Sequence, residues 1–309
     1  MKRTRTKQKK RLSVDAILTS DWHLREDTPT CRTDDFPEAQ WNKVRQVREL
    51  QEKYDCPVLH AGDLFHHWKP SPALLTQCIR ELPDQFYTVY GNHDLPQHSM
   101  DLAYKSGITT LAESGKIKVL DKGHWDQEPD VDNCFIFYRQ EDKIQKTGFN
   151  KRKAHIWHKM VWTKKPPYPG AEKELEGHVL LKKYPQFDLI LTGDNHQQFV
   201  CEYKGRLLVN PGCLSRQTAA FADFRPAVWL YNAEKNKVKP HYLDIAQDVV
   251  SRVHIEKKAE RDERISAFVE RLDTDWEAGL DFEENLKRFG EENEIPKPVM
   301  EICYKAMEV

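Results

Sequence analysis

The sequence lacks any apolar run that approaches the roughly 20 residues a membrane-spanning helix needs. Its basic beginning is not followed by an apolar core, so the pattern of a secretory signal peptide is missing as well. No internal repeat or low-complexity tract interrupts the 309 residues. These absences predict a soluble, cytoplasmic protein with no membrane partner.

Cysteine is present, but its pattern lacks pairs. The seven cysteines are odd in number and form no C-x-x-C motif, which argues against a disulfide framework in a chain of this size. Cys56, Cys78 and Cys134 lie in or beside apolar segments. We expect these three to be buried, reduced thiols.

Net charge is also nearly absent, at −1, so the overall balance argues neither for nor against nucleic acid as a partner. The distribution is uneven, because residues 1–12 form a basic N-terminal arm and residues 251–309 lean acidic. A basic arm can follow phosphates, and a solvated tail is the plainer interpretation. Because 10% of the residues are aromatic, most of the chain is expected to fold.

Short apolar runs alternate with helical stretches from residue 13 onward. The runs over residues 14–23, 56–63 and 85–94 each end in polar residues, and the stretches between them have apolar residues at helical spacing. This order predicts an α/β domain whose ligands collect beyond the C-terminal ends of the strands. Further strands are expected after residue 115, with few helices among them. Residues 13–250 are therefore expected to form two packed sheets with helices outside.

Residues 251–309 return to helical spacing and predict a C-terminal appendage of two or three short helices. The apolar faces of these helices must be buried against something. Folding back onto the preceding domain and docking onto a partner's coiled coil are both open interpretations.

Polar motifs stand at five of the expected strand ends: Asp21-x-His23, Gly62-Asp63, Gly91-Asn92-His93-Asp94, His158, and Gly193-Asp194-Asn195-His196. Carboxylates, imidazoles and an amide suit divalent ions such as Mn²⁺, Fe²⁺ or Zn²⁺. Each motif alone is more often an ordinary polar turn or a helix cap. All five in one order, each ending a strand, indicate a site for two metal ions that share one bridging carboxylate.

The order of these motifs resembles the calcineurin-like metallophosphoesterase family over residues 13–245. The resemblance implies an α/β fold, an αββα sandwich of two packed mixed sheets flanked by helices. It also implies two divalent metal ions, with Mn²⁺ expected first and Mg²⁺, Fe²⁺ or Zn²⁺ as alternatives. The implied ligands of the first ion are Asp21, His23, Asp63 and His196, and those of the second are Asp63 as the bridge, Asn92 and His158.

The same resemblance implies that His93 protonates the leaving oxygen as a general acid, with Asp94 orienting its ring. One position departs from the family pattern. The family usually has Gly-His-x-His where this chain has Gly193-Asp194-Asn195-His196, so Asp194 replaces an imidazole. We expect Asp194 to bind the second ion through oxygen, with a weaker second ion as the alternative.

The motif His155-Ile-Trp-His158 offers two histidines three residues apart on one expected strand. Side chains at this spacing point to opposite faces of a strand. His158 fits the strand end better, and we favour it as the ligand over His155.

Within the family, the stretch GDLFHHWKPSP over residues 62–72 resembles the SbcD type of DNA repair exonuclease, and so does the turn formed by residues 210–216 (NPGCLSR). By this resemblance His66 contacts the scissile phosphate or steers the DNA end; capping of the next helix is the alternative. The substrate-binding candidates are Trp68, Lys69 and Arg25. Further features that would support nucleic acid are Trp22, Arg32, Lys164, Lys165 and the basic arm.

The sequence thus predicts a metal-dependent phosphodiesterase, first a DNA nuclease that uses a metal-activated water. A small-molecule phosphoesterase acting on cyclic nucleotides or phosphomonoesters is the alternative. A non-catalytic scaffold is a further one, against which the intact His93-Asp94 pair argues. The chain is shorter than SbcD-like proteins, which puts an SbcC-like ATPase partner in doubt.

Overall fold

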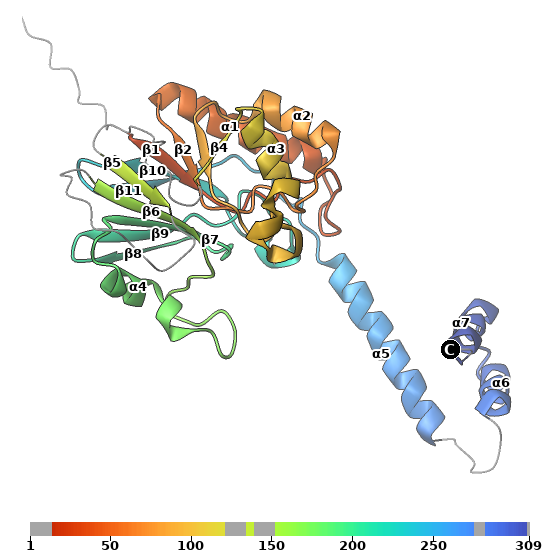
Figure 1. Cartoon of the computed structure of the whole chain (residues 1–309). Helices are drawn as coiled ribbons and strands as arrows, with labels where there is room; N and C mark the ends of the chain where they lie inside the picture. Colours follow the sequence, from red (N-terminus) through yellow and green to blue (C-terminus); the bar gives the residue numbers. More distant parts are fainter. Residues whose placement is uncertain (1–13, 121–133, 139–151, 275–281, 308–309) are drawn as a thin grey trace, which may run out of the picture. The chain divides into compact units, whose positions relative to one another are not determined.

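The computed structural model describes residues 14–120, 134–138, 152–274 and 282–307 (Figure 1). The predicted basic arm and the side chain of Cys134 lie outside the described part. The chain divides into two compact units, Met1–Ser251 and Arg252–Val309. Among the described residues, no helix is both long and apolar enough to cross a bilayer.

The first sheet of the larger unit has the strand order β11-β10-β1-β2-β3-β4. Its strands are β1 (Ala16–Thr19), β2 (Val58–His60), β3 (Phe86–Thr88), β4 (Lys118–Val119), β10 (Ala227–Asn232) and β11 (Lys237–Tyr242). The four strands β1 to β4 are parallel, β10 pairs antiparallel with β1, and β11 pairs antiparallel with β10. The C-terminal ends of β1, β2 and β3 therefore meet at one edge.

The second sheet has the order β5-β6-β7-β9-β8. Its strands are β5 (Cys134–Tyr138), β6 (Arg152–His158), β7 (Leu189–Gly193), β8 (Phe199–Tyr203) and β9 (Arg206–Asn210). Only β8 runs antiparallel within it. The sequence had not predicted β8, because its burial alternates along the strand but one of its exposed positions is the apolar Val200. Both sheets are mixed, as expected.

Three apolar cores show the layers of the sandwich (Figure 1). The first lies between the first sheet and the helices α1 (Phe36–Tyr54), α2 (Pro72–Glu81) and α3 (Gly107–Glu113). The second joins residues of both sheets, such as Leu18, Leu59 and Leu191. The third lies between the second sheet and α4 (Gly177–Lys183). The predicted αββα sandwich is confirmed.

The helices α1 and α2 beside the first sheet each begin with a side-chain cap. The side chain of Asp35 accepts a hydrogen bond from the amide of Glu38 at the start of α1, and Ser71 does the same for Leu74 at the start of α2. The buried face of α1 carries Trp41. These caps stabilise the first turns of α1 and α2. The two helices pack against the first sheet and so support the loops that follow β1 and β2.

The smaller unit contains α5 (Val253–Thr274), α6 (Phe282–Glu292) and α7 (Lys297–Met307). Its helical character is as the sequence indicated. Within it the rings of Phe268 and Phe289 meet at 5.2 Å between centroids. Val299 and Ile302, two apolar residues of α7, are 46% and 68% exposed. The apolar residues of α7 are therefore only partly buried.

Candidate metal centre

The sandwich brings five chain segments together at the C-terminal ends of its central strands. Asp21 and His23 follow β1, Asp63 follows β2, and Asn92 and His93 follow β3. From the second sheet, His158 is the last residue of β6, and Asp194 and His196 follow β7. The two sheets thus supply opposite halves of one polar cluster, as parallel strands do in α/β proteins.

The backbone at this cluster is held in a rarely occupied conformation. Asp21, His23, Asp63 and Asp194 all have positive φ angles, of 52°, 46°, 57° and 75°. Non-glycine residues seldom adopt this region, at a cost of about 1–3 kcal/mol each, and such residues gather at functional sites. The left-handed turns point these side chains back toward the strand ends and into the cluster.

Gly91 shows how closely the loops approach. A Cβ atom built on Gly91 would lie 2.0 Å from Oδ1 of Asp63, a distance that no real contact shows. Only glycine lets the loop after β3 come this close to the carboxylate that ends β2. The glycine of the Gly-Asn-His-Asp motif is therefore a packing requirement of the site.

The first group of candidate ligands comprises Asp21, His23 and His196. The Nε2 atoms of His23 and His196 face each other at 3.0 Å, and Oδ1 of Asp21 lies 3.9 Å from Nε2 of His196. Burial is the main reason that the pKa of His23 falls well below its ordinary value. His23 is therefore neutral at pH 7, which is the form that binds a metal ion.

Asp63 stands between this group and a second one. Its Oδ2 atom lies 3.5 Å from Nε2 of His23 and 3.4 Å from Nε2 of His158. Its Oδ1 atom accepts a hydrogen bond of 2.9 Å from the amide of His93. The second group contains Asp21, Asp63 and His158, and Oδ1 of Asn92 lies 2.8 Å from Nε2 of His158.

The orientation of His158 is set by the main chain. Its Nδ1 atom lies 2.7 Å from the oxygen of Ala61, and since a carbonyl can only accept, Nδ1 carries the proton and Nε2 points into the cluster. Burial alone would lower the pKa of His158, but the carboxylate of Asp63 raises it to about 10. The cluster thus attracts positive charge strongly.

His155, the other histidine of this strand, faces away from the cluster. Its ring stacks on Phe187 at 4.8 Å between centroids, and Phe187 belongs to the core under α4. The choice of His158 over His155 agrees with this geometry.

Asp194 takes part in the cluster through both its main chain and its side chain. Its amide donates to Oδ1 of Asp21 at 2.9 Å, and its own Oδ1 lies 3.9 Å from Nε2 of His158. The side chain is 31% exposed. Its carboxylate is thus close to the second group but reaches solvent more readily than Asp21 or Asp63.

The residues present fit two divalent cations. Oδ2 of Asp21 and Nδ1 of His23 are buried and have no hydrogen-bond partner among the described residues. A buried carboxylate oxygen without a donor is costly unless a cation or a proton meets it. With carboxylate oxygens and imidazole nitrogens converging, the cluster has the donor set that Mn²⁺, Fe²⁺ and Zn²⁺ accept once the imidazoles have given up their protons.

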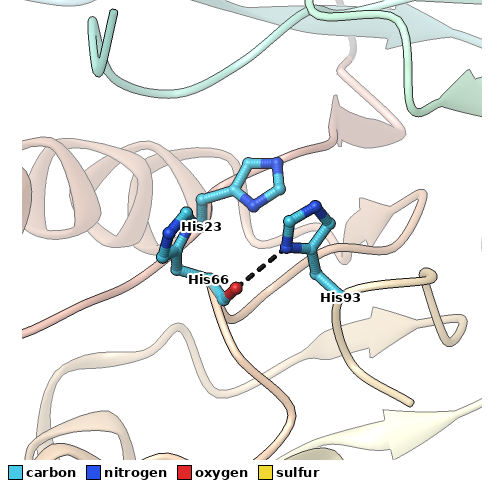
Figure 2. A group of neighbouring side chains, drawn as sticks. All are labelled: His23, His66 and His93. Atoms are coloured by element: carbon cyan, nitrogen blue, oxygen red, sulfur yellow. Dashed lines mark hydrogen bonds between the residues drawn. The ribbon is translucent and has the colours of Figure 1, made fainter. Parts of the chain in front are cut away.

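His66 and His93 lie beside His23, a member of the first group (Figure 2). Candidate ligand atoms of His23, His66 and His93 all lie within 4.8 Å of one another. Nδ1 of His93 donates to the main-chain oxygen of His66 at 2.8 Å, drawn as the dashed line in Figure 2. This bond leaves Nε2 of His93 as the nitrogen that can meet a substrate.

The predicted orienting role of Asp94 is wrong in its detail. Its buried carboxylate accepts hydrogen bonds from the amides of Leu64, Phe65 and Gly91, at 3.3, 3.0 and 2.9 Å. It ties the loop after β2 to the loop after β3. The acceptor that orients the ring of His93 is instead an oxygen of the main chain, which no sequence motif reveals.

Some of the residues considered for substrate or nucleic-acid binding are accessible to solvent, and others are buried. Trp68 is half-buried and Lys69 is exposed, and the guanidinium of Arg25 is paired with Asp27 near His66. Trp22 and Arg32, considered as nucleic-acid contacts, are buried instead. Trp22 is part of the first core, and Arg32 bonds to Asp34 and to the oxygen of Arg216. These two residues are structural, whereas Lys164 and Lys165 are exposed.

Two residues missed from the sequence hold the ligand loops in place. The side-chain amide of Asn210 donates to the oxygens of Asn195 and Gln197 on either side of His196. The side-chain amide of Gln217 donates to the oxygen of His23 at 3.1 Å. The Asn-Pro-Gly motif had marked this turn, but its bonds to distant loops could not be inferred.

The sequence profile described as calcineurin-like phosphoesterase matches residues 16–198, more than half of the chain. The chain belongs to this family. The matched range contains every candidate ligand described above, whereas the turn with Asn210 and Gln217 lies beyond it. The fold of the chain agrees with the family that its motifs suggested.

The chain is similar to several known proteins. It is 28% identical over 185 residues to the DNA double-strand break repair protein Mre11 of Haloferax volcanii, covering 54% of this chain and 38% of that protein. A solved structure described as a novel archaeal phosphodiesterase has 16% identity and a TM-score of 0.41, over 74% of this chain and 99% of its own. The protein TT1561 of Thermus thermophilus has 12% identity and a TM-score of 0.42, over 74% and 97%.

Proposed function

We propose that this protein is a dinuclear metal-dependent phosphodiesterase that hydrolyses DNA. One observation carries the dinuclear site. A single oxygen of Asp63 lies 3.5 Å from Nε2 of His23 and 3.4 Å from Nε2 of His158, so one carboxylate serves both ligand groups. Asp21, His23 and His196 would hold the first ion together with Asp63. Asn92, His158 and Asp194 would complete the second.

When bound, two divalent cations would activate a water as nucleophile and offset the charge of the phosphate oxygens. The protein itself would supply a proton donor, His93, on the side of the leaving oxygen. His93 bonds through Nδ1 to the oxygen of His66, so a proton that it gives has to come from Nε2 of the doubly protonated imidazolium, which leaves the neutral ring with its proton on Nδ1. That proton would go to the leaving oxygen as the phosphoester bond breaks. The half-buried ring of His66, 5.6 Å from that of His93, borders the same space.

DNA as the substrate is supported by sequence rather than by geometry. The similar protein of Haloferax volcanii is named for DNA double-strand break repair, and the match covers only 38% of it. The loop that carries His66 also carries Trp68 and Lys69, and Arg25 lies near it. Side chains of these types contact bases and phosphates in nucleic-acid complexes. An SbcC-like ATPase partner stays a prediction.

The decisive experiment incubates end-labelled single- and double-stranded DNA with the protein and Mn²⁺. We expect labelled DNA to shorten with Mn²⁺ and to stay intact with EDTA. The Asp63→Asn variant, assayed in parallel, excludes a contaminating nuclease. Intact DNA together with Mn²⁺-dependent hydrolysis of bis(p-nitrophenyl) phosphate would show a small-molecule phosphoesterase instead. Hydrolysis of neither would reject the catalytic proposal.

A further inference from the structure

A short segment over residues 216–225 is bound to the ligand loops from both ends. At its start, the side-chain amide of Gln217 donates to the oxygen of His23 at 3.1 Å. At its end, the side-chain amide of Gln198 donates to the oxygen of Arg225 at 3.1 Å, two residues from His196. In between, the buried guanidinium of Arg216 donates to the oxygen of Ala222 at 2.9 Å. The segment is thus held at a set position beside the metal centre.

Two phenylalanines of this segment lie next to a candidate ligand. The ring of Phe221 is 6.1 Å from the ring of His196 between centroids, at an interplanar angle of 53°. Phe224 meets Phe221 at 5.1 Å and nearly at a right angle, 89°. The side chain of His196 is itself 36% exposed. The aromatic pair therefore lies at the open side of the metal centre.

The packing of the two rings is not that of core residues. Neither Phe221 nor Phe224 is among the residues of the three apolar cores or packed against them in the described part of the chain. Both are only half-buried. By contrast Trp22, also close to the centre in sequence, is fully buried in the first core. The two rings are half-exposed and belong to no core, and hydrogen bonds fix the segment that carries them. Their exposed surface can therefore contact a ligand.

The charges of the segment favour a flat, uncharged ligand over a phosphate. Arg216 is buried and bonded to main-chain oxygens. The remaining charged residues, Asp223 and Arg225, are exposed and opposite in sign. They cancel, so the segment offers no net attraction to the phosphodiester backbone. What it offers is an aromatic face, on which every nucleobase can stack.

We propose that Phe221 is a stacking platform for a nucleobase of the substrate whose phosphate lies at the metal centre, with Phe224 supporting it. This inference rests on the proposed function, because it requires a phosphoester bound at the same centre. It adds how the substrate is recognised, which is through a nucleobase next to the reacting phosphate and not through the phosphate alone. Phe221 would be a specificity-determining residue, acting on the base and not on the bond that breaks.

The test compares three diesters that share one leaving group. They are thymidine 5′-(p-nitrophenyl phosphate), thymidine 3′-(p-nitrophenyl phosphate) and methyl p-nitrophenyl phosphate, each assayed with the Mn²⁺-loaded full-length protein. The variants are Phe221→Ala, Phe221→Trp, and Tyr104→Ala as a matched control, since Tyr104 is an aromatic residue with 68% exposure elsewhere in the fold. Using both isomers of the nucleoside substrate covers either direction of the chain at the site.

We expect Phe221→Ala to lower kcat/KM about tenfold or more on at least one thymidine diester, as loss of a base–aromatic stack does. The methyl diester should change less than about twofold. Phe221→Trp should retain activity on all three, and Tyr104→Ala should match the wild type. An equal loss on all three diesters would overturn the proposal, because Phe221 would then only position His196. No loss on either thymidine diester would overturn it too.

A binding measurement separates this proposal from the proposed function. Calorimetry of the Mn²⁺-loaded protein compares thymidine 5′-monophosphate with inorganic phosphate. We expect the nucleotide to bind about tenfold more tightly than phosphate to the wild type, and the difference to vanish in Phe221→Ala. This result would support the platform even if no diester is hydrolysed, in which case only the proposed function fails. Equal affinities for the two ligands in the wild type would reject the platform.

Discussion

His93 is held by the main-chain oxygen of His66, 2.8 Å from its Nδ1 atom. The two residues come from different loops, after β3 and after β2, and their rings lie 5.6 Å apart at an angle of 29°. Because the bond is to the main chain, substitution of the His66 side chain leaves the acceptor in place. The orientation of His93 therefore depends on the path of the loop over residues 63–66, and on whatever anchors that loop.

His93→Asn should reduce turnover of a phosphodiester by about a hundredfold or more while bound metal is nearly unchanged. The reason is that Nε2 of His93 is available to the leaving oxygen, whereas the amide of His93 supports Asp63 through the main chain, which the substitution preserves. Turnover and metal content by elemental analysis are measured together. His178→Asn, at an exposed histidine on α4, is the control. Loss of metal in parallel with activity would mean that His93 is a ligand.

Asp63→Asn should remove most bound metal and most activity. Its Oδ2 atom approaches both ligand groups, and an amide lacks the charge that two cations share. Metal content is read after dialysis against a metal-free buffer. Asp84→Asn, at a carboxylate with 78% exposure, serves as control. Two tightly bound ions in Asp63→Asn would refute the bridging role.

Asp94→Asn should lower both stability and turnover. The carboxylate accepts from three amides of two loops, and an amide in its place turns an NH₂ group toward donors. Loss of about 1–3 kcal/mol in the free energy of unfolding is expected. Since the anchored loop carries the oxygen of His66, kcat should fall while KM changes little. Denaturant titration and steady-state kinetics measure the two effects. A fall in kcat with stability unchanged would restore the direct role that the sequence suggested.

Asp194→Ala should weaken the second ion selectively, because Oδ1 of Asp194 lies 3.9 Å from Nε2 of His158. Asp194→His, which gives the common family motif, should retain activity and shift the preference from Mn²⁺ toward Zn²⁺ or Fe²⁺. A carboxylate is a harder ligand than an imidazole and adds negative charge. Metal titrations of both variants decide the matter. Unchanged affinity and preference in both would show that Asp194 is no ligand.

Lys43→Met should stabilise the protein by about 1–3 kcal/mol at pH 7. Lys43 is 4% exposed, and burial lowers its pKa from 10.5 to about 8. The folded state thus holds this proton less tightly than the unfolded chain does, so wild-type stability should rise with pH between about 8 and 10.5. Below that window the cost of the buried charge is fully present. Denaturant titrations at pH 7 and 9.5 measure it, and Lys53→Met, at an exposed position of the same helix, should change little.

The candidate ligand residues could be predicted from the chain because their signals are local. Left-handed or glycine-assisted turns directly after buried strands place Asp21, His23, Asp63 and Asn92 at the sheet edge, and parallel strands bring their ends together whatever the details of packing. The caps of α1 and α2 were equally local, since each is a hydrogen bond spanning three residues. The ligand types, their order and the two-sheet fold follow from such short-range signals.

Only the tertiary structure decided which face each side chain takes and what holds it. His155 and His158 alternate across one strand, and the packing of β6 against the core under α4 turned His155 away. From the sequence, Trp22 and Arg32 were candidates for nucleic-acid contacts. In the folded protein Trp22 is part of the first core and Arg32 donates to the main-chain oxygen of Arg216. Asp94 and Phe221 acquired their partners from segments 29 and 25 residues away, Phe65 and His196. Contacts at such separations depend on how elements pack, which local sequence does not encode.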